Sequence, residues 1–501
     1  MNDKKNLTII DELIKTYSSP FDSSKKETAI ILAAGHGKRI KSQKSKMLHN
    51  IWGEPTVVRV YDACSKGLDE ANIIVVVGIK AVDVIQKVGK RDNGSYVYQA
   101  EQKGTGHAVQ VALKQIENKD YDGVVFVFPG DMGLIDEASV SRFRDKFYKS
   151  KSDMMVLTGL FDGDYSENYY GRIIRVKEVD ADGKKSDYTG QVIKIMEHKD
   201  ILSLPENKDY IVEFKGKKYS YTREELLKNN EFNSGVFAFK YNHLARLIKK
   251  IESNNVQKEI YLTDLIYLFN EEGLSVGAIS PIQQHVIMGF NNKSVLKEME
   301  KIARSHVYEK LKDVIEIEDE EDFFIADEVV EQILKLDEKG KPLDIHIGRG
   351  AYIYKGVKLN YGCTIGRESI LRDNIVLGKN VTIGEGVEIS CYPGQKVTMG
   401  DNVEIMKGDI IKGNIVIGND SKIESSVNIT GSDEFPVVIG SNVIVKGTTY
   451  IYGSKIADNV LIYHSVLVRK DVINPNKDGS QFKIGFYIPE VIGKEAIKDL
   501  N

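Results

Sequence analysis

A short basic segment near the N-terminus is the part of the sequence best suited to bind an anion. It carries five cations, at Lys38, Arg39, Lys41, Lys44 and Lys46. Like charges this close repel one another, and the whole chain has a net charge of −4, so we expect an anionic ligand there. Gly35 and Gly37 allow backbone N–H groups to approach such a ligand closely. Arg39 can bind phosphate oxygens with two parallel hydrogen bonds, and Lys46 can act as a point charge.

The basic segment matches neither of two common phosphate-binding motifs. A Walker A loop would need glycine at position 32, where Leu32 stands, and a dinucleotide fingerprint would need glycine at position 40, where Ile40 stands. The alternative interpretation is an ordinary solvated basic loop. We adopt that interpretation for Lys41 and Lys44 only.

The pattern around this segment is typical of a parallel α/β sheet. Apolar strand-like runs alternate with helical stretches, in the order strand 28–35, helix 55–68, strand 72–78, helix 81–88, strand 95–99, helix 106–119 and strand 123–131. Such a pattern predicts a Rossmann-like, mostly parallel sheet covered on both faces. Ligands bind at the carboxyl ends of strands in these sheets, and the basic segment, residues 99–108 and residues 129–135 all follow predicted strands.

Asp131 stands at the end of the last predicted strand of this series. A carboxylate at a strand end, opposite a cationic loop, is suited to hold a Mg²⁺ ion that is also bound to phosphate. Its alternative role is to cap the helix that follows.

The C-terminal part has an apolar period of six residues. Large apolar residues recur from Ile347 to Ile389, from Met399 to Ile429 and, with a one-residue slip, from Ile439 to Val468. This period fits neither a helix nor a hairpin, and it predicts a parallel β-helix of about six or seven coils in which each short strand points one large side chain inward. The alternative is a β-sandwich in which the spacing arises by chance.

Composition excludes several other classes of protein. The negative net charge argues against general nucleic-acid binding, and no apolar run approaches the roughly 20 residues that span a membrane. The first 20 residues lack the apolar core of a signal peptide. Cys64, Cys363 and Cys391 are too few and too far apart for a disulfide framework or a CxxC metal site, and we expect them to be buried. We therefore expect a cytoplasmic protein with no nucleic-acid or membrane partner.

The segment LAAGHGKRIKSQKSKML (32–48) resembles the signature loop of the sugar-1-phosphate nucleotidylyltransferases. The match is closer to the N-acetylglucosamine-1-phosphate uridylyltransferase half of the bacterial bifunctional enzyme that makes UDP-N-acetylglucosamine. Other stretches follow in that family's order: QAEQKGTGHAVQ (99–110), PGDMGLI (129–135), YYGRIIR (169–175), IMEHKD (195–200), FNSGVF (232–237), YLTDLI (261–266) and FNN (290–292). The resemblance covers about residues 30–292.

The resemblance implies that UTP reacts with a sugar-1-phosphate, with Mg²⁺ as the cofactor, by in-line attack. This reaction needs no protein base, so His107 would be structural. It implies that Arg39, Lys46 and Asp131 are catalytic. The other implied roles are nucleotide contacts by Leu32, Ala33, Ala34, Gly35, Gly37 and Gly130; uracil recognition by Gln99, Gly104 and Thr105; sugar and ribose contacts by Gly171, Glu197 and Asn233; and Mg²⁺ coordination by Asp131 with Asn291.

Three positions depart from the family pattern. Lys38 replaces a threonine, Ser45 replaces the proline before the lysine, and Gly133 replaces a proline after the metal aspartate. We expect Lys38 to add charge but lose a hydroxyl donor, and Ser45 to loosen the turn that aims Lys46. Two alternatives therefore stay open: an enzyme for another sugar-1-phosphate or base, and a catalytically weakened scaffold or regulatory protein.

The resemblance also implies that the β-helix is left-handed and assembles into a homotrimer. In the family this domain carries a second activity, acetyl transfer to glucosamine-1-phosphate. The loop that holds its catalytic histidine has no counterpart here, because no histidine lies between His346 and His464. We expect that activity to be absent. The predicted parts of the chain are a helical extension (1–27), a nucleotidyltransferase domain (28–292), a helical and acidic connector (293–342), the β-helix (343–472) and a tail (473–501).

Overall fold

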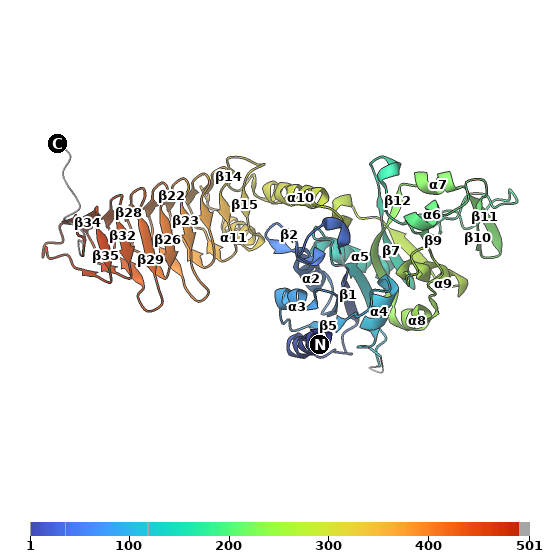
Figure 1. The fold of residues 1–501 in the computed structure, drawn as a ribbon. Helices are drawn as coiled ribbons and strands as arrows, with labels where there is room; N and C mark the ends of the chain where they lie inside the picture. The colour runs from blue at the N-terminus through green and yellow to red at the C-terminus, as the bar shows by residue number, and fades with distance from the viewer. Residues whose placement is uncertain (1, 36, 118–119, 490–501) are drawn as a thin grey trace. The chain divides into compact units, whose positions relative to one another are not determined.

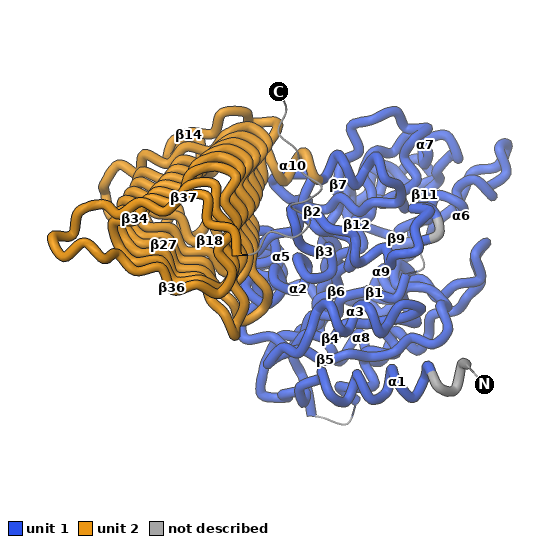
Figure 2. Tube along the Cα trace, turned by 60° about the vertical axis from the view of Figure 1, so that its left-hand side comes forward, with its two compact units in different colours: residues 1–299 blue, residues 300–501 orange. Residues whose placement is uncertain are grey.

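The computed structural model of the chain describes residues 2–35, 37–117 and 120–489, apart from the side chains of residues 2–5 and of Lys38. It divides the chain into two units, residues 1–299 and 300–501 (Figure 2). The last two residues of the helix predicted over 106–119 lie outside the described residues.

A nine-stranded sheet organises the first unit (Figure 1). Seven strands form its main path in the order β13 (Val276–Ile279), β7 (Met154–Leu160), β12 (Glu231–Lys240), β6 (Val124–Pro129), β1 (Glu27–Ala33), β4 (Asn72–Val77) and β5 (Gly94–Tyr98). Within this path only β12 runs antiparallel to its neighbours, β6 and β7. The prediction of a mostly parallel, Rossmann-like sheet is therefore confirmed.

Both faces of the sheet are buried, because its apolar strands point alternate side chains to opposite sides. Ile31 on β1 belongs to one core, with residues of α2 (Thr56–Gly67), α3 (Ala81–Val88) and α5 (Glu137–Ser150). Its neighbour Ile30 belongs to the other core, with residues of α4 (Thr105–Leu113), α8 (Tyr241–Leu247) and α9 (Leu265–Glu271). This layering leaves the carboxyl ends of the central strands open to a ligand.

The N-terminal extension protects an edge of the sheet. Helix α1 (Asn2–Tyr17) places Ile10 in the core beside β5, the last strand in the sheet order. Directly after α1, the amide of Ser19 donates to the carbonyl of Gly94 at 2.8 Å, and the Ser18 hydroxyl accepts from the amide of Tyr96 at 3.0 Å. These contacts cover backbone groups of an edge strand that would otherwise be free to pair with another chain.

A smaller subdomain is inserted between β7 and β12. It contains the antiparallel strands β8 (Arg172–Arg175) and β9 (Val192–Met196), the hairpin β10 (Tyr210–Phe214) and β11 (Lys217–Tyr221), and the short helices α6 (His198–Leu202) and α7 (Arg223–Lys228). These elements share a core of their own that includes Ile174, Val212 and Tyr219. The subdomain supplies the wall that holds Glu197.

The second unit is a left-handed parallel β-helix, as predicted. Its short strands stack into three parallel sheets of nine, eight and seven strands. The six-residue period places one apolar residue of each strand in the interior, directly over its counterpart in the next coil. One such column, fully or nearly fully buried, contains Ile347, Ile365, Ile383, Ile405, Ile423, Val445 and Ile462.

Asparagine and aspartate occupy one repeated corner of the β-helix. Asn380, Asn402, Asp420 and Asn442 all have left-handed backbone conformations, with φ between 55° and 58°. Asn402 accepts from Asn380 at 3.0 Å and donates to Asp420 at 2.9 Å, which links three successive coils. These residue types tolerate the left-handed region better than other side chains do, and this explains their place in the repeat.

The β-helix is longer than the sequence period predicts at both ends. The predicted helical and acidic connector (293–342) contributes β14 (Glu316–Ile317) and β15 (Phe324–Ile325), which pair with β16 (His346–Ile347) and β17 (Tyr352–Ile353). At the other end, β37 (Phe482–Gly485) pairs with β34 (Val460–Tyr463). The six-residue period is interrupted by α11 (Asp327–Asp337) and by the turn after residue 472, so the outer coils have no visible repeat.

Candidate active site

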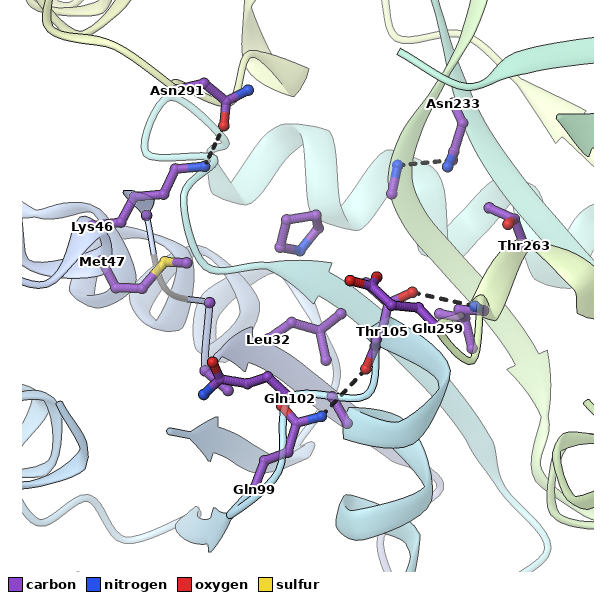
Figure 3. Close-up of a pocket in the computed structure, with 18 of the residues that line it drawn as sticks. Leu32, Lys46, Met47, Gln99, Gln102, Thr105, Asn233, Glu259, Thr263 and Asn291 are labelled. Atoms are coloured by element: carbon purple, nitrogen blue, oxygen red, sulfur yellow. Dashed lines mark hydrogen bonds between the residues drawn. The ribbon is translucent and has the colours of Figure 1, made fainter. Parts of the chain in front are cut away.

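A cavity of about 600 Å³ opens at the carboxyl ends of β1 and β6 in the first unit. Figure 3 shows that its walls come from the basic loop, the turn before α4, β12 and the segment around Glu259. Twelve of the predicted site residues line it: Leu32, Ala34, Gly35, Gly37, Arg39, Lys46, Gln99, Gly104, Thr105, Glu197, Asn233 and Asn291.

Three of the other four predicted site residues contact lining residues. Asp131 forms an ion pair with Lys46. The amide of Gly130 donates to the carbonyl of Leu32 at 3.0 Å. A β-carbon on Gly171 would lie 3.1 Å from Oε1 of Glu197. Ala33 is the exception, because it is the buried last residue of β1.

Glycine is required where the basic loop folds back on itself. Gly37 has φ of 61°, and a β-carbon there would lie 2.7 Å from Cβ of Lys46. Larger residues would be strained and would push Lys46 out of place. Arg39, in the 3₁₀ turn η1 (Lys38–Ile40), is exposed and lines the cavity, and no carboxylate among the described residues pairs with it. Its guanidinium is therefore available to an anionic ligand.

The two predicted metal ligands converge on the ammonium group of Lys46. Lys46 Nζ contacts Oδ2 of Asp131 and donates to Oδ1 of Asn291 at 3.1 Å (Figure 3 shows the Asn291 contact). A β-carbon on Gly289 would lie 3.1 Å from Oδ2 of Asp131, so the segment before Asn291 packs against the carboxylate. A carboxylate and an amide oxygen that already share one cation are ligands that Mg²⁺ accepts, so the residues fit the predicted metal.

The described residues contain no separate metal cluster. Among them, no group of three or more histidine, cysteine, aspartate or glutamate side chains is placed to hold a metal ion. A cation at Asp131 and Asn291 would therefore take its remaining ligands from phosphate and water, as is usual for Mg²⁺.

A network of hydrogen bonds fixes the part of the cavity predicted to bind the base. Gln99 Nε2 lies 3.0 Å from His107 Nδ1 and 3.3 Å from the carbonyl of Gly104. Thr105 Oγ1 accepts from the amide of Leu262 at 3.2 Å, and the amide of Ile260 donates to the carbonyl of Lys103 at 2.7 Å. The segment 259–263 is thus tied to the turn before α4, and the two segments form one wall.

The predicted sugar-binding residues are also brought together. The amide of Asn233 donates to the carbonyl of Gly171 at 2.9 Å, and Oδ1 of Asn233 accepts from the amide of Gly235 at 2.8 Å. Burial, reinforced by the charges of Asp200, Asp264 and Glu259, raises the pKa of Glu197 to about 7. This carboxyl group therefore changes charge near neutral pH.

Several lining residues were not predicted from the sequence: Met47, Gln102, Ala108, Pro129, Gly235, Phe237, Glu259, Leu262 and Thr263. Eight of them lie within stretches that carry the family resemblance, at 32–48, 99–110, 129–135, 232–237 and 261–266, but nothing in a single sequence distinguishes them from structural positions. Glu259 precedes the last of these stretches and carries no signal of its own. Tyr170 is a further neighbour of Asp131. Burial is the main cause that raises the pKa of Tyr170, and the charge of Asp131 raises it further.

Two of the three departures from the family pattern have a structural setting. Ser45 is buried and has φ of −54°, a value that proline also adopts, so the turn before Lys46 keeps its shape without the ring. Gly133 packs closely, because a β-carbon there would lie 2.8 Å from side-chain atoms of Ile51 and of Thr56. The side chain of Lys38, the third departure, lies outside the described residues.

Residues 29–170 match the family model described as the MobA-like NTP transferase domain. The chain is 31% identical over 472 residues to the bifunctional protein GlmU of Clostridium kluyveri, covering 87% of this chain and 91% of that protein. It is 32% identical over 440 residues to the bifunctional protein GlmU of Clostridium acetobutylicum, covering 86% of this chain and 81% of that protein. The crystal structure of UDP-glucose pyrophosphorylase complexed with UDP-glucose aligns with 56% of the chain and 98% of its own, at 14% identity and a TM-score of 0.38.

No helix among the described residues is both long and apolar enough to cross a membrane.

Proposed function

The chain belongs to the family of the bifunctional protein GlmU and is a sugar-1-phosphate nucleotidylyltransferase, and on this premise we propose that it transfers the uridylyl group of UTP to N-acetylglucosamine-1-phosphate. The products are UDP-N-acetylglucosamine and pyrophosphate. The observation that carries the proposal is that one cavity is lined by the basic loop, by Gln99 with the turn before α4, and by Glu197 with Asn233.

The reaction needs no protein base, because the attacking phosphate oxygen of the sugar phosphate is already an anion. It attacks the α-phosphorus of UTP, and the bond to pyrophosphate breaks on the opposite side. The chain supplies position and charge: Arg39 holds the leaving phosphates, Lys46 holds the reacting phosphates, and Asp131 with Asn291 would hold the metal. Mg²⁺ held by these two residues would supply neutralisation of the negative charge on the phosphate oxygens.

The other residues of the cavity orient the two substrates. Leu32 to Gly35, with Gly37 and Gly130, follow the nucleotide, and Gln99 with Gly104 and Thr105 recognises the uracil. Gly171, Glu197 and Asn233 bind the N-acetylglucosamine and the ribose. A panel of sugar-1-phosphates and nucleoside triphosphates, ranked by kcat/KM for pyrophosphate release, tests this assignment. A higher value for another sugar or base would replace the proposed substrates, and no release with any pair would favour a scaffold or regulatory role.

The proposed role of the β-helix is to form a homotrimer. Two of its outward apolar residues support this role, since Val416 and Val438 lie side by side on one face and are 44% and 37% exposed. Light scattering at micromolar concentration should give three times the mass of the chain. A monomer mass would contradict the proposal.

We also propose that the β-helix does not transfer acetyl groups. His464, the histidine available in its last coils, has Nδ1 2.6 Å from the hydroxyl of Thr448 and packs against Phe486, with ring centroids 5.5 Å apart. These contacts favour a structural role. Incubation with acetyl-CoA and glucosamine-1-phosphate should release no free thiol above background, and sustained release that depends on the sugar phosphate would contradict this.

A further inference from the structure

The ammonium group of Lys46 occupies the point at which the two proposed metal ligands meet. It contacts Asp131 and Asn291, and its side chain is only 11% exposed, with Asp131 at 15%. The ring of Phe290 lies 5.4 Å from the same ammonium group and adds a cation–π contact. Lys46 is therefore held by three neighbouring side chains.

One position cannot hold two cations. A divalent ion between the Asp131 carboxylate and the Asn291 amide would lie within hydrogen-bond distance of the ammonium group, where repulsion between the two cations is strong. The role proposed above also requires the Lys46 ammonium on the reacting phosphates. The contact with Asp131 and the contact with phosphate are therefore alternative positions of one side chain.

We propose that Lys46 is an internal occupant of the divalent-cation site, which a metal ion enters only when Lys46 moves away. The identity of the incoming metal–nucleotide rests on the proposed function, whereas the competition between Lys46 and a divalent cation rests on the contacts alone. A nucleotide that arrives with its own metal ion would provide phosphate oxygens for the Lys46 ammonium group. Asp131 and Asn291 would then be free to hold the metal ion.

The local structure allows this exchange without movement of the backbone. Lys46 begins the short turn η2 (Lys46–Leu48), and its Cβ lies against Gly37. The amide of Leu48 donates to the carbonyl of Ser45 at 3.0 Å, and this hydrogen bond fixes the backbone of the turn. The base of the side chain is fixed, so the flexible four-carbon stem carries the ammonium group from one partner to the other.

The exchange couples the two ligands thermodynamically. Free metal must compete with a charge-assisted contact already formed by the protein, so it binds weakly alone. Nucleotide phosphates withdraw the competitor and strengthen metal binding, and by reciprocity the metal strengthens nucleotide binding by the same factor.

Mn²⁺ binding to the full-length protein without nucleotide or sugar phosphate tests the proposal, with free Mn²⁺ followed by electron paramagnetic resonance. We expect Lys46→Met to bind Mn²⁺ about tenfold more tightly, or better, than the unaltered chain, because the competing charge-assisted contact is gone. The double variant Lys46→Met/Asp131→Asn should lose that gain. Lys44→Met is the matched control, since it removes an exposed lysine of the same loop.

Equal Mn²⁺ affinity in the unaltered chain and in Lys46→Met, with an unchanged circular dichroism spectrum, would overturn the proposal. An equal gain in Lys44→Met would also overturn it, because the effect would then be general charge removal. Lys46→Ala is the second variant if Lys46→Met does not fold. Because no substrate is present, failure of the proposed uridylyl transfer would leave this result unaffected.

Discussion

The side-chain amide of Gln99 donates a 3.0 Å hydrogen bond to Nδ1 of His107. His107 lies in the first turn of α4, the helix that follows Gln99 in the chain. The same amide nitrogen of Gln99 lies 3.3 Å from the carbonyl of Gly104. With both amide hydrogens used, the carbonyl oxygen of Gln99 is the group left for a ligand in the cavity. An acceptor at this position suits the N3–H donor of uracil and not the unprotonated N3 of cytosine.

Replacement of His107 should therefore weaken base selection more than catalysis. His107→Leu removes the acceptor that holds the Gln99 amide, so the amide can turn its donor side to the base. We expect the ratio of kcat/KM for UTP over CTP to fall about tenfold, with a smaller change in kcat for UTP. An unchanged ratio would show that His107 does not position Gln99.

Asp131→Asn should abolish transfer and leave the fold intact. The substitution removes one of the two proposed protein ligands of Mg²⁺ and its negative charge, and turnover at saturating Mg²⁺ should fall at least about a hundredfold. Asp136→Asn is the matched control, because Asp136 accepts from the amide of Ser139 at 2.9 Å as an N-cap and asparagine caps equally well. Turnover of Asp131→Asn within tenfold of the unaltered enzyme would contradict the metal-ligand role.

The affinity for the sugar phosphate should depend on pH through Glu197. Burial and three neighbouring carboxylates raise the pKa of Glu197 to about 7, so its charged carboxylate form is lost as the pH falls through 7. KM for N-acetylglucosamine-1-phosphate should then rise below pH 7. Glu197→Gln should have a raised KM with a flatter pH profile, apart from the ionisation of the substrate phosphate, which is common to both proteins. Parallel profiles would exclude Glu197 as the titrating group.

The β-helix should be less stable above neutral pH than in mild acid, because of Asp409. Its side chain is fully buried, Oδ1 accepts from the amide of Val427 at 2.8 Å, and Oδ2 has no hydrogen-bond partner among the described residues. Burial raises its pKa to about 7. Between about pH 4 and 7 the folded chain holds a proton that the unfolded chain has released, so stability falls as the pH rises through this window and is then constant.

Asp409→Asn keeps an acceptor for Val427 and removes the charge. We expect its Tm to be higher than that of the unaltered chain at pH 8 by several degrees, and the difference to shrink toward pH 5. Asp401→Asn, at an exposed corner of the same β-helix, should have the Tm of the unaltered chain at both pH 8 and pH 5. A Tm difference that does not vary with pH would show that Asp409 is not the cause.

The local features of the site could be predicted because short segments carry them. Gly35, Gly37 and Arg39 are neighbours in the chain, and the apolar strand before them fixes the end of the sheet at which they lie. The β-helix could be predicted for the same reason, since each coil repeats the pattern of the one before it. Its outer coils could not, because β14 and β15 have no six-residue period and only their pairing places them there.

Contacts between distant segments could not be read from the sequence. Lys46 is 245 positions from Asn291, and Thr105 is 157 positions from Leu262. Whether the Lys46 ammonium meets a carboxylate or a phosphate depends on packing around Gly37 and Gly289, which a linear pattern does not contain. The role of residues 1–27 was equally hidden, because protection of an edge strand requires knowledge of which strand is at the edge.

Uridylyl transfer to N-acetylglucosamine-1-phosphate is best tested by identifying the products. Purified protein with UTP, N-acetylglucosamine-1-phosphate and Mg²⁺ should be followed by ³¹P nuclear magnetic resonance and mass spectrometry, with Asp131→Asn in parallel. We expect UDP-N-acetylglucosamine and pyrophosphate to appear in equal amounts, only when the sugar phosphate is present, and not with the variant. Pyrophosphate release without the sugar phosphate, or no nucleotide sugar at any enzyme concentration, would contradict it.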